Sequence, residues 1–333
     1  MSTATPSGPS HRVLVTGTAG FIGFHLASRL LDQGHAVCGI DNFNDNSPVQ
    51  LKRDRHAQLE RRAGYAWKVT DLTDLAALQA AFADFRPDCV VNLAAQSGVR
   101  HSISNPLACQ KPNLEGFLNV LECCRQAPGK PRFIYASSSS VYGGSTALPF
   151  TEDQRVDTPI SLYAATKKAN ELMAHSYSHL YGMQTIGLRF FTVYGPWGRP
   201  DMAYWLFADA MLAGRPIKVF NDGDMYRDFT YIDDIISGVV GCICSRSIGR
   251  CEVFNIGNSR SEKLTDLIGL IASELGISAP QMELLPMQDG DVPATYASID
   301  KIRAAIGYEP TTPISVGVPK FIHWFIEQGR KYQ

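Results

Sequence analysis

Short apolar runs alternate with helical patterns along the first 190 residues. Six of these runs predict strands, at 12–17, 36–41, 66–69, 89–95, 132–137 and 185–190. Helical patterns separate them, for example at 21–33, 74–83, 113–126 and 161–181. Continuous Val, Ile and Leu runs are typical of strands buried on both faces, and hence of a parallel sheet. The alternation therefore predicts an α/β fold built on a Rossmann-type doubly wound sheet.

The pattern loosens after about residue 190, where Gly, Pro and aromatic residues cluster. We expect residues 11–190 to form the Rossmann domain and 191–333 to form mainly a smaller α/β substrate-binding lobe over the carboxyl ends of the strands. A return of the chain to the first domain around 217–257 is an open alternative. Residues 1–10 lack the apolar core of a signal peptide and predict a disordered tail.

Composition and charge exclude several classes of partner. The 333 residues are 45% hydrophobic and carry a net charge of -1, so no global field attracts nucleic acid or anionic lipid. No run of about 18 apolar residues predicts a membrane span. The eight cysteines include no C-x-x-C pair, which favours free thiols and a cytoplasmic protein.

A glycine-rich turn, "VTGTAGFIG", follows the first strand and opens the first helix. Gly17 allows the tight turn, Gly20 lets the backbone approach a pyrophosphate at the helix N-terminus, and Gly23 allows close packing of helix on sheet. Asp41 ends the second strand, where a carboxylate accepts ribose hydroxyls and repels a 2′-phosphate. These residues predict NAD rather than NADP as the cofactor. Asp71, after the third strand, either contacts the adenine or caps the helix at 74–83.

Tyr163 and Lys167 lie four residues apart in a helical pattern, so both side chains share one helix face. A lysine ammonium beside a phenol favours the phenolate, which can act as a base near neutral pH. The spacing alone arises often by chance, but here it follows a nucleotide-type turn and a serine-rich strand end. His175 and His179 also lie one turn apart, but no third ligand follows at a recognised spacing, and we expect no metal site.

The motifs "TGTAGFIG", "NLAAQ", "ASSSSVYG", "YAATK" and "RDFTYIDD" resemble the extended short-chain dehydrogenase/reductase family of nucleotide-sugar enzymes. The longer runs "PISLYAATKKANELMAHSYSHLYG", "LRFFTVYGPWGRPDM" and "MQDGDVPATYA" are similar to its UDP-glucuronate 4-epimerase subfamily, from residue 12 to about 326. The resemblance implies bound NAD, a UDP-sugar substrate and a homodimer formed through the helices at 105–126 and 161–181. The residues expected to contact NAD are Gly17, Gly20, Phe21, Ile22, Gly23, Asp41, Asn42, Asp71, Leu72, Leu93, Ala94, Ala95, Gln96, Tyr163 and Lys167.

The same resemblance makes Ser138 the catalytic serine that relays the C4 hydroxyl proton to Tyr163, with simple capping of the strand end as the alternative. Ser139 and Ser140 fill places where dehydrating or decarboxylating relatives carry acids. Serines protonate a leaving group poorly near pH 7, so an elimination route is poorly equipped. Their hydroxyls can instead donate hydrogen bonds to a carboxylate.

Two further groups of residues complete the expected substrate site. Thr192 and Arg199, in "TVYGPWGRP", are expected to hold a uronate carboxylate with the serines, unless Arg199 is only a surface charge. Arg227 and Arg100 are expected to bind the diphosphate; the alternatives are a salt bridge between Arg227 and the adjacent aspartate, and a surface position for Arg100. Asp291 either binds the uridine ribose or shapes a turn.

The resemblance thus implies an isomerase that converts UDP-glucuronate to UDP-galacturonate at C4 through a transient 4-keto sugar, with Tyr163 as base. A UDP-glucose or other neutral nucleotide-sugar 4-epimerase is the alternative within the same class. A non-catalytic NAD-binding regulatory protein is the alternative of another class, although such a protein has no need for Tyr163, Lys167 and the serine run.

Overall fold

A parallel sheet of seven strands forms the centre of the computed structural model, which describes residues 10–332. The expected tail at 1–10 lies outside these residues apart from Ser10. The strand order is β11-β6-β5-β4-β1-β2-β3. Their bounds are Arg12–Thr16 (β1), Ala36–Asp41 (β2), Tyr65–Val69 (β3), Cys89–Asn92 (β4), Arg132–Ser138 (β5), Thr185–Phe190 (β6) and Cys251–Ile256 (β11). The order reverses between β1 and β4, which is where doubly wound sheets bind ligands.

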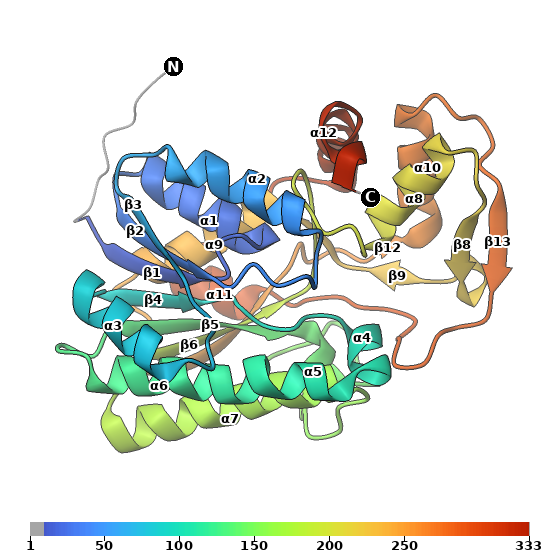
Figure 1. The fold of residues 1–333 in the computed structure, drawn as a ribbon. Coiled ribbons are helices and arrows are strands. Elements are labelled where there is room, and N and C mark those ends of the chain that lie inside the picture. The colour runs from blue at the N-terminus through green and yellow to red at the C-terminus, as the bar shows by residue number, and fades with distance from the viewer. Residues whose placement is uncertain (1–9, 333) are drawn as a thin grey trace.

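Helices cover both faces of the sheet (Figure 1). Helices α1 and α9 pack together on one face, while α3, α6 and α7 pack on the other. Their bounds are Phe21–Asp32 (α1), Ile232–Cys244 (α9), Leu75–Phe85 (α3), Gly116–Gln126 (α6) and Leu162–Tyr181 (α7). Further helices are Val49–Glu60 (α2), Val99–Ser104 (α4), Pro106–Gln110 (α5) and Asp300–Ile306 (α11), with a π-helical turn at Lys111–Glu115. The predicted Rossmann-type architecture is confirmed.

A smaller lobe lies beside the carboxyl ends of the strands, on the right in Figure 1. Strand β8 (Ile217–Phe220) pairs in parallel with β13 (Met282–Leu285), and β9 (Tyr226–Arg227) pairs with β12 (Glu262–Lys263). Strand β7 (Thr192–Tyr194) pairs with β10 (Phe229–Tyr231). The helices of the lobe are Ala203–Leu212 (α8), Leu264–Glu274 (α10) and Ile314–Glu327 (α12). Because α9 and β11, and later α11, belong to the main domain, the chain enters the lobe three times.

The cysteines are free thiols, and six of the eight are buried. Cys242 is buried in the core, whereas Cys244, the last residue of α9, is exposed. No helix within residues 10–332 is long and apolar enough to cross a bilayer.

Candidate active site

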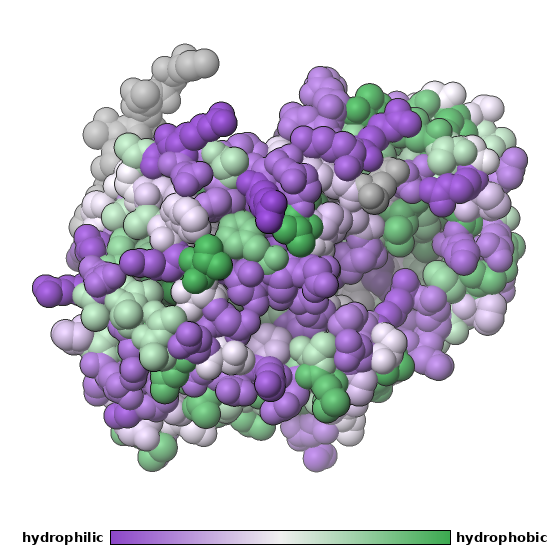
Figure 2. All heavy atoms as spheres, in the orientation of Figure 1, coloured by the Kyte–Doolittle hydropathy of each residue, from purple (hydrophilic) through white to green (hydrophobic). Residues whose placement is uncertain are grey.

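A cleft of about 1240 Å³ opens between the carboxyl ends of the parallel strands and the smaller lobe. Figure 2 shows the hollow between the two masses of the molecule, with hydrophilic side chains around its mouth. Every residue that the sequence analysis placed at cofactor or substrate lines this cleft. The structure thus brings the predicted residues together, while the role of each one stays a prediction.

The glycine positions of the turn between β1 and α1 have no room for a side chain. Gly17 has a φ of +77° and donates its N–H to the carbonyl of Ile40 over 2.7 Å. A Cβ at Gly23 would lie 2.1 Å from the Gly17 oxygen, and one at Gly17 would lie 2.9 Å from the nitrogen of Ala94. The turn therefore stays close to both the sheet and the helix, with its backbone at the cleft.

Asp41 ends β2 at the cleft, and its carboxylate is nearly buried, with 8% of the side chain exposed. Its two oxygens accept hydrogen bonds from the backbone N–H groups of Ala19, over 3.1 Å, and Phe43, over 2.9 Å. The ammonium of Lys52 lies 3.7 Å away. These contacts fix the carboxylate where a Rossmann fold binds the adenosine ribose.

Asp71 also lines the cleft, but it does not cap the following helix. Asp74 takes that place, because its side chain accepts the N–H of Ala77 at the start of α3. Asp71 instead accepts hydrogen bonds from Thr73 and from the side-chain amide of Asn42, which is 2.7 Å away. The helix-cap alternative for Asp71 is therefore wrong.

Tyr163 and Lys167 share one face of α7, as predicted from their spacing, and the Lys167 ammonium lies over the tyrosine ring. The Lys167 ammonium donates to the carbonyl of Ala136 over 2.9 Å and lies 5.8 Å from the centre of the tyrosine ring. Burial lowers the pKa of Lys167 to about 8. Burial also raises the pKa of Tyr163, although a hydrogen bond with Ser138 and the charge of Arg199 act to lower it. The strand carbonyl holds the ammonium near the tyrosine ring, and the effect of the lysine on the phenolate stays a prediction.

The serine run continues from β5 into a short 3₁₀ helix at Ser139–Tyr142. Ser138 caps that helix by accepting the N–H of Ser140, and its hydroxyl donates to the Ser140 hydroxyl over 3.1 Å. Capping does not remove Ser138 from the candidate site, since its hydroxyl still lowers the pKa of the Tyr163 phenol. The neighbouring Ser137 points elsewhere and donates to buried Glu171 over 2.7 Å. The strand end therefore presents Ser138 and Ser140 to the cleft.

A π-helical turn holds the segment after β4, which lines the cleft near Gln96, in place. Asn113, within that turn, accepts the backbone N–H of Gln96 over 2.8 Å and donates to the Gln96 carbonyl over 3.0 Å. Its amide also donates to Thr166 on α7, and its own carbonyl accepts from Asn170. Such π-helical turns occur often at functional sites. This network ties the segment after β4 to the helix that carries Tyr163.

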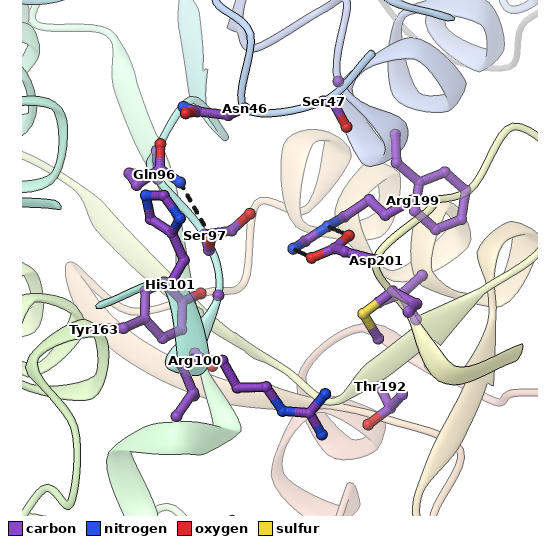
Figure 3. A pocket seen from close by; sticks show the side chains of 18 of the residues that line it. Asn46, Ser47, Gln96, Ser97, Arg100, His101, Tyr163, Thr192, Arg199 and Asp201 are labelled. Carbon is purple, nitrogen blue, oxygen red and sulfur yellow. Dashed lines mark hydrogen bonds and ion pairs between the residues drawn. The ribbon is translucent and has the colours of Figure 1, made fainter. Parts of the chain in front are cut away.

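Arg199 and Asp201 lie on the side of the cleft that faces Tyr163, as Figure 3 shows. The guanidinium of Arg199 donates to both oxygens of Asp201, over 3.0 and 2.5 Å. Arg199 is 29% exposed and Asp201 60% exposed, so the arginine lies deeper in the cleft than its carboxylate partner. Thr192, at the start of β7, projects into the same space. The surface alternative for Arg199 is therefore wrong.

Two arginines share one carboxylate at the lobe side of the cleft. Arg227, on β9, donates to Asp291 over 2.6 Å, and Arg100, on α4, lies 3.9 Å from the other oxygen of Asp291. The salt bridge considered for Arg227 with its neighbour Asp228 is not formed. Asp228 is buried and accepts the N–H groups of Asn258 and Ala297 instead.

Sequence reasoning missed several polar residues that shape this cleft. Among them are Lys52, Arg55, Asn113 and Asp201. Lys52 and Arg55 come from α2, whose charged sequence shows little amphipathic contrast. Within residues 10–332, no cluster of three or more His, Cys, Asp or Glu side chains is suited to hold a metal ion.

The fold and the cleft together define a class of protein. A doubly wound sheet, a dinucleotide-type glycine turn and a Ser–Tyr–Lys set at one cleft are the features of the extended short-chain dehydrogenases/reductases. Residues 13–257 match the NAD dependent epimerase/dehydratase family, and the chain belongs to this family. The predicted family is confirmed.

Known members resemble the chain over almost its whole length. UDP-glucuronate 4-epimerase 2 of Arabidopsis thaliana is 44% identical over 336 residues, which cover 96% of this chain and 77% of that protein. The crystal structure of UDP-glucuronic acid 4-epimerase from Bacillus cereus, in complex with UDP-glucuronic acid and NAD, superposes with a TM-score of 0.87 at 34% identity and covers 95% of this chain and 99% of that one. UDP-glucose 4-epimerase from Thermotoga maritima, solved with UDP-glucose, gives a TM-score of 0.84 at 29% identity, over 95% of this chain and 98% of that one.

Proposed function

We propose that the protein is an NAD-dependent UDP-glucuronate 4-epimerase, which interconverts UDP-glucuronate and UDP-galacturonate. The observation that carries the proposal is the position of Arg199. A guanidinium deep in the cleft faces Tyr163 across a space bordered by the hydroxyls of Ser138, Ser140 and Thr192. An arginine fork among hydroxyl donors suits a carboxylate on the sugar better than a neutral hydroxymethyl group.

The residues present fit NAD. The glycine turn leaves bare backbone at the cleft, and the fixed carboxylate of Asp41 suits an unphosphorylated ribose. When bound, NAD supplies the acceptor and the donor of the hydride at the sugar C4. The chain's contacts would come from the residues that line its side of the cleft: Gly17, Gly20, Phe21, Ile22, Gly23, Asp41, Asn42, Asp71, Leu72, Leu93, Ala94, Ala95, Gln96, Tyr163 and Lys167.

The chain's own groups handle the proton. The phenol oxygen of Tyr163 accepts the C4 hydroxyl proton directly or through Ser138, and returns it when the sugar is reduced on its other face. The ammonium of Lys167 carries its charge below about pH 8. It stays hydrogen-bonded to the Ala136 carbonyl, at the part of the cleft lining that we assign to the cofactor. The 4-keto sugar must turn between the two steps while its uronate stays bound. Several small hydroxyls can follow such a rotation better than one rigid partner.

The carboxylate site also protects the intermediate. A 4-keto uronate is a β-keto acid, which loses carbon dioxide readily when its carboxylate stands perpendicular to the ketone. Hydrogen bonds from Thr192 and Arg199 hold the carboxylate in another orientation and keep it solvated by donors. We expect Arg199→Ala and Thr192→Ala to release a UDP-pentose, detected by chromatography and mass spectrometry. If epimerisation falls in both variants and no pentose is ever formed, the protective role is wrong.

Arg227 and Arg100 would bind the diphosphate, and Asp291 would then leave the arginines for the uridine ribose. The carboxylate now neutralises both cations, with contacts of 2.6 and 3.9 Å. Binding of the diphosphate exchanges one anionic partner for another. The site therefore needs no unpaired buried charge at any stage.

The decisive test is product formation from UDP-glucuronate by the purified protein. We expect UDP-galacturonate to appear, and Tyr163→Phe to lower the rate by at least about a hundredfold, as loss of a general base does. Tyr181→Phe, at the exposed end of the same helix, is the matched control and should retain activity. Turnover of UDP-glucose but not UDP-glucuronate would establish the neutral-sugar alternative, and NAD binding without turnover of either sugar the regulatory one.

We also propose that two copies pair through α6 and α7 in a reducing compartment such as the cytoplasm. Three exposed leucines on these helices support the pairing: Leu118, Leu172 and Leu180 have exposed fractions of 39%, 56% and 67%. Buried free thiols support the compartment. Leu172→Glu should halve the mass measured by sedimentation equilibrium, whereas Leu284→Glu, equally exposed on β13, should not. A monomeric parent protein would contradict the proposal.

A further inference from the structure

Arg55, on α2, is a buried cation that is bound to backbone oxygens from two distant segments. Its residue is 1% exposed. One end of the guanidinium donates to the carbonyl of Ala19 over 2.9 Å. The other end donates to the carbonyls of Trp197, over 3.1 Å from Nε, and Gly198, over 2.8 Å. Burial lowers the pKa of Arg55 to about 9, which still leaves it charged at neutral pH. A buried charge is costly unless it is paired or hydrogen-bonded, and here backbone carbonyls supply the hydrogen bonds.

The two segments that Arg55 joins belong to the two halves of the cleft. Ala19 lies inside the glycine turn, and its own N–H donates to Asp41 over 3.1 Å. Trp197 and Gly198 immediately precede Arg199, which we have assigned to the uronate. The guanidinium therefore spans from the cofactor turn to the loop that carries the carboxylate-binding arginine.

The loop at 195–199 depends on such external contacts for its shape. Trp197 has a φ of +59°, a left-handed conformation that a bulky residue adopts only when its surroundings impose it. The carbonyl of Pro196 accepts from Nε2 of His25 over 2.9 Å, and burial holds the pKa of His25 at about 4, so the ring is neutral. The N–H of Arg199 donates to the hydroxyl of Tyr204 over 3.2 Å. Side chains from α1 and α2 thus bind three consecutive carbonyls.

We propose that Arg55 is a positioning residue for uronate recognition. It fixes the backbone from which the Arg199 side chain extends, relative to the cofactor turn. The inference rests on the proposed function. Because the carbonyls of residues 197 and 198 set the direction of the backbone at residue 199, a shift there moves the guanidinium of Arg199 relative to the sugar. Arginine suits this place because its planar fork donates in two directions at once, which a lysine ammonium on a flexible stem does not.

The test compares the affinities for UDP-glucuronate and UDP-glucose, measured by calorimetry with NAD bound. The ratio of the two affinities reports selectivity without a measurement of turnover. We expect Arg55→Lys to lower the ratio of the two affinities about tenfold, a typical coupling between residues of one network. In an Arg199→Ala background the same substitution should leave the ratio unchanged. Arg53→Lys, an exposed position on the same helix, is the matched control.

Tyr204→Phe provides a second route to the same conclusion if Arg55 variants fold poorly. It removes the hydroxyl that accepts the Arg199 N–H and leaves the buried cation in place, so it should also lower the ratio. If Arg55 had only a structural role, Arg55→Lys would lower the affinity for both ligands equally, or would change the ratio of affinities by the same factor with and without Arg199. Either result overturns the inference. A wild-type protein that shows no preference for UDP-glucuronate overturns the proposed specificity and this inference with it, whereas a selective wild type with an unaffected Arg55→Lys variant overturns the inference alone.

Discussion

Replacement of Lys167 by methionine should stabilise the substrate-free protein at neutral pH while it removes the activity. The ammonium lies in the interior beside the serine strand, with 4% of the residue exposed and one hydrogen bond to the Ala136 carbonyl. Its charge serves the reaction rather than the fold. Methionine has a similar length and carries no charge, so it relieves the cost of burying the ammonium.

The magnitude follows from the pKa. Burial lowers the pKa of Lys167 from its ordinary value of 10.5 to about 8, and one pKa unit corresponds to about 1.4 kcal/mol, so the buried charge costs about 3 kcal/mol near neutral pH. Since the folded pKa is below the unfolded one, the unfolded chain binds more protons between the two values. The free energy of unfolding therefore rises with pH through this window, and by about pH 9.5 the cost falls to roughly 1.4 kcal/mol.

Urea unfolding of the wild type and Lys167→Met, followed by circular dichroism at pH 7 and pH 9.5 without NAD or sugar, measures this difference. The advantage of the variant should shrink by about 2 kcal/mol between the two pH values. The lost hydrogen bond to Ala136 lowers the advantage by about 1 kcal/mol at both. Lys218→Met, at an exposed position on β8, should show no such pH dependence. An advantage that is equal at both pH values would refute the reasoning.

Three further predictions concern buried charge, the glycine turn and cofactor choice. Glu171→Gln breaks the bidentate pair with Arg189, whose contacts are 2.8 and 2.9 Å, and should lower the free energy of unfolding by about 3–5 kcal/mol in urea titrations. Gly23→Ala should weaken NAD binding in calorimetry at least about tenfold, or about 1.4 kcal/mol, because a Cβ there would lie 2.1 Å from the Gly17 oxygen and must displace the turn. Gly269→Ala, with open space around it, should not weaken binding. Asp41→Ser should raise the affinity for NADP relative to NAD, because it removes the charge that repels a 2′-phosphate.

The strands of the main sheet were predicted well from short apolar runs between helical patterns. The six predicted strands all lie within a few residues of the observed ones. Most of them are buried, whereas β3 lies at the edge of the sheet and is largely exposed. Helix α2 was missed. Its sequence, "VQLKRDRHAQLE", buries Lys52 and Arg55 as well as leucines, so its charged residues hide the periodicity.

The same contrast holds at the cleft. Motif residues such as Gly17 and Tyr163 were predictable because their spacing carries the chemistry. Asp201 was not, since a single aspartate in a Gly- and Pro-rich loop has no periodic signal, and its meaning comes only from the facing guanidinium of Arg199. The sequence spacing also does not predict that Lys167 donates to a strand carbonyl. That contact depends on how α7 packs on β5.

The pairing of Arg199 with Asp201 has a consequence for how strictly the protein selects its sugar. A resident carboxylate already accompanies the guanidinium, so a neutral substrate does not strand an isolated positive charge in the cleft. A uronate that binds Arg199 must replace Asp201, whose carboxylate can move out into water. The net gain in binding free energy is therefore only the difference between the two sets of contacts. Discrimination at this position should therefore be graded rather than absolute, and its strength should depend on how firmly the loop retains Asp201.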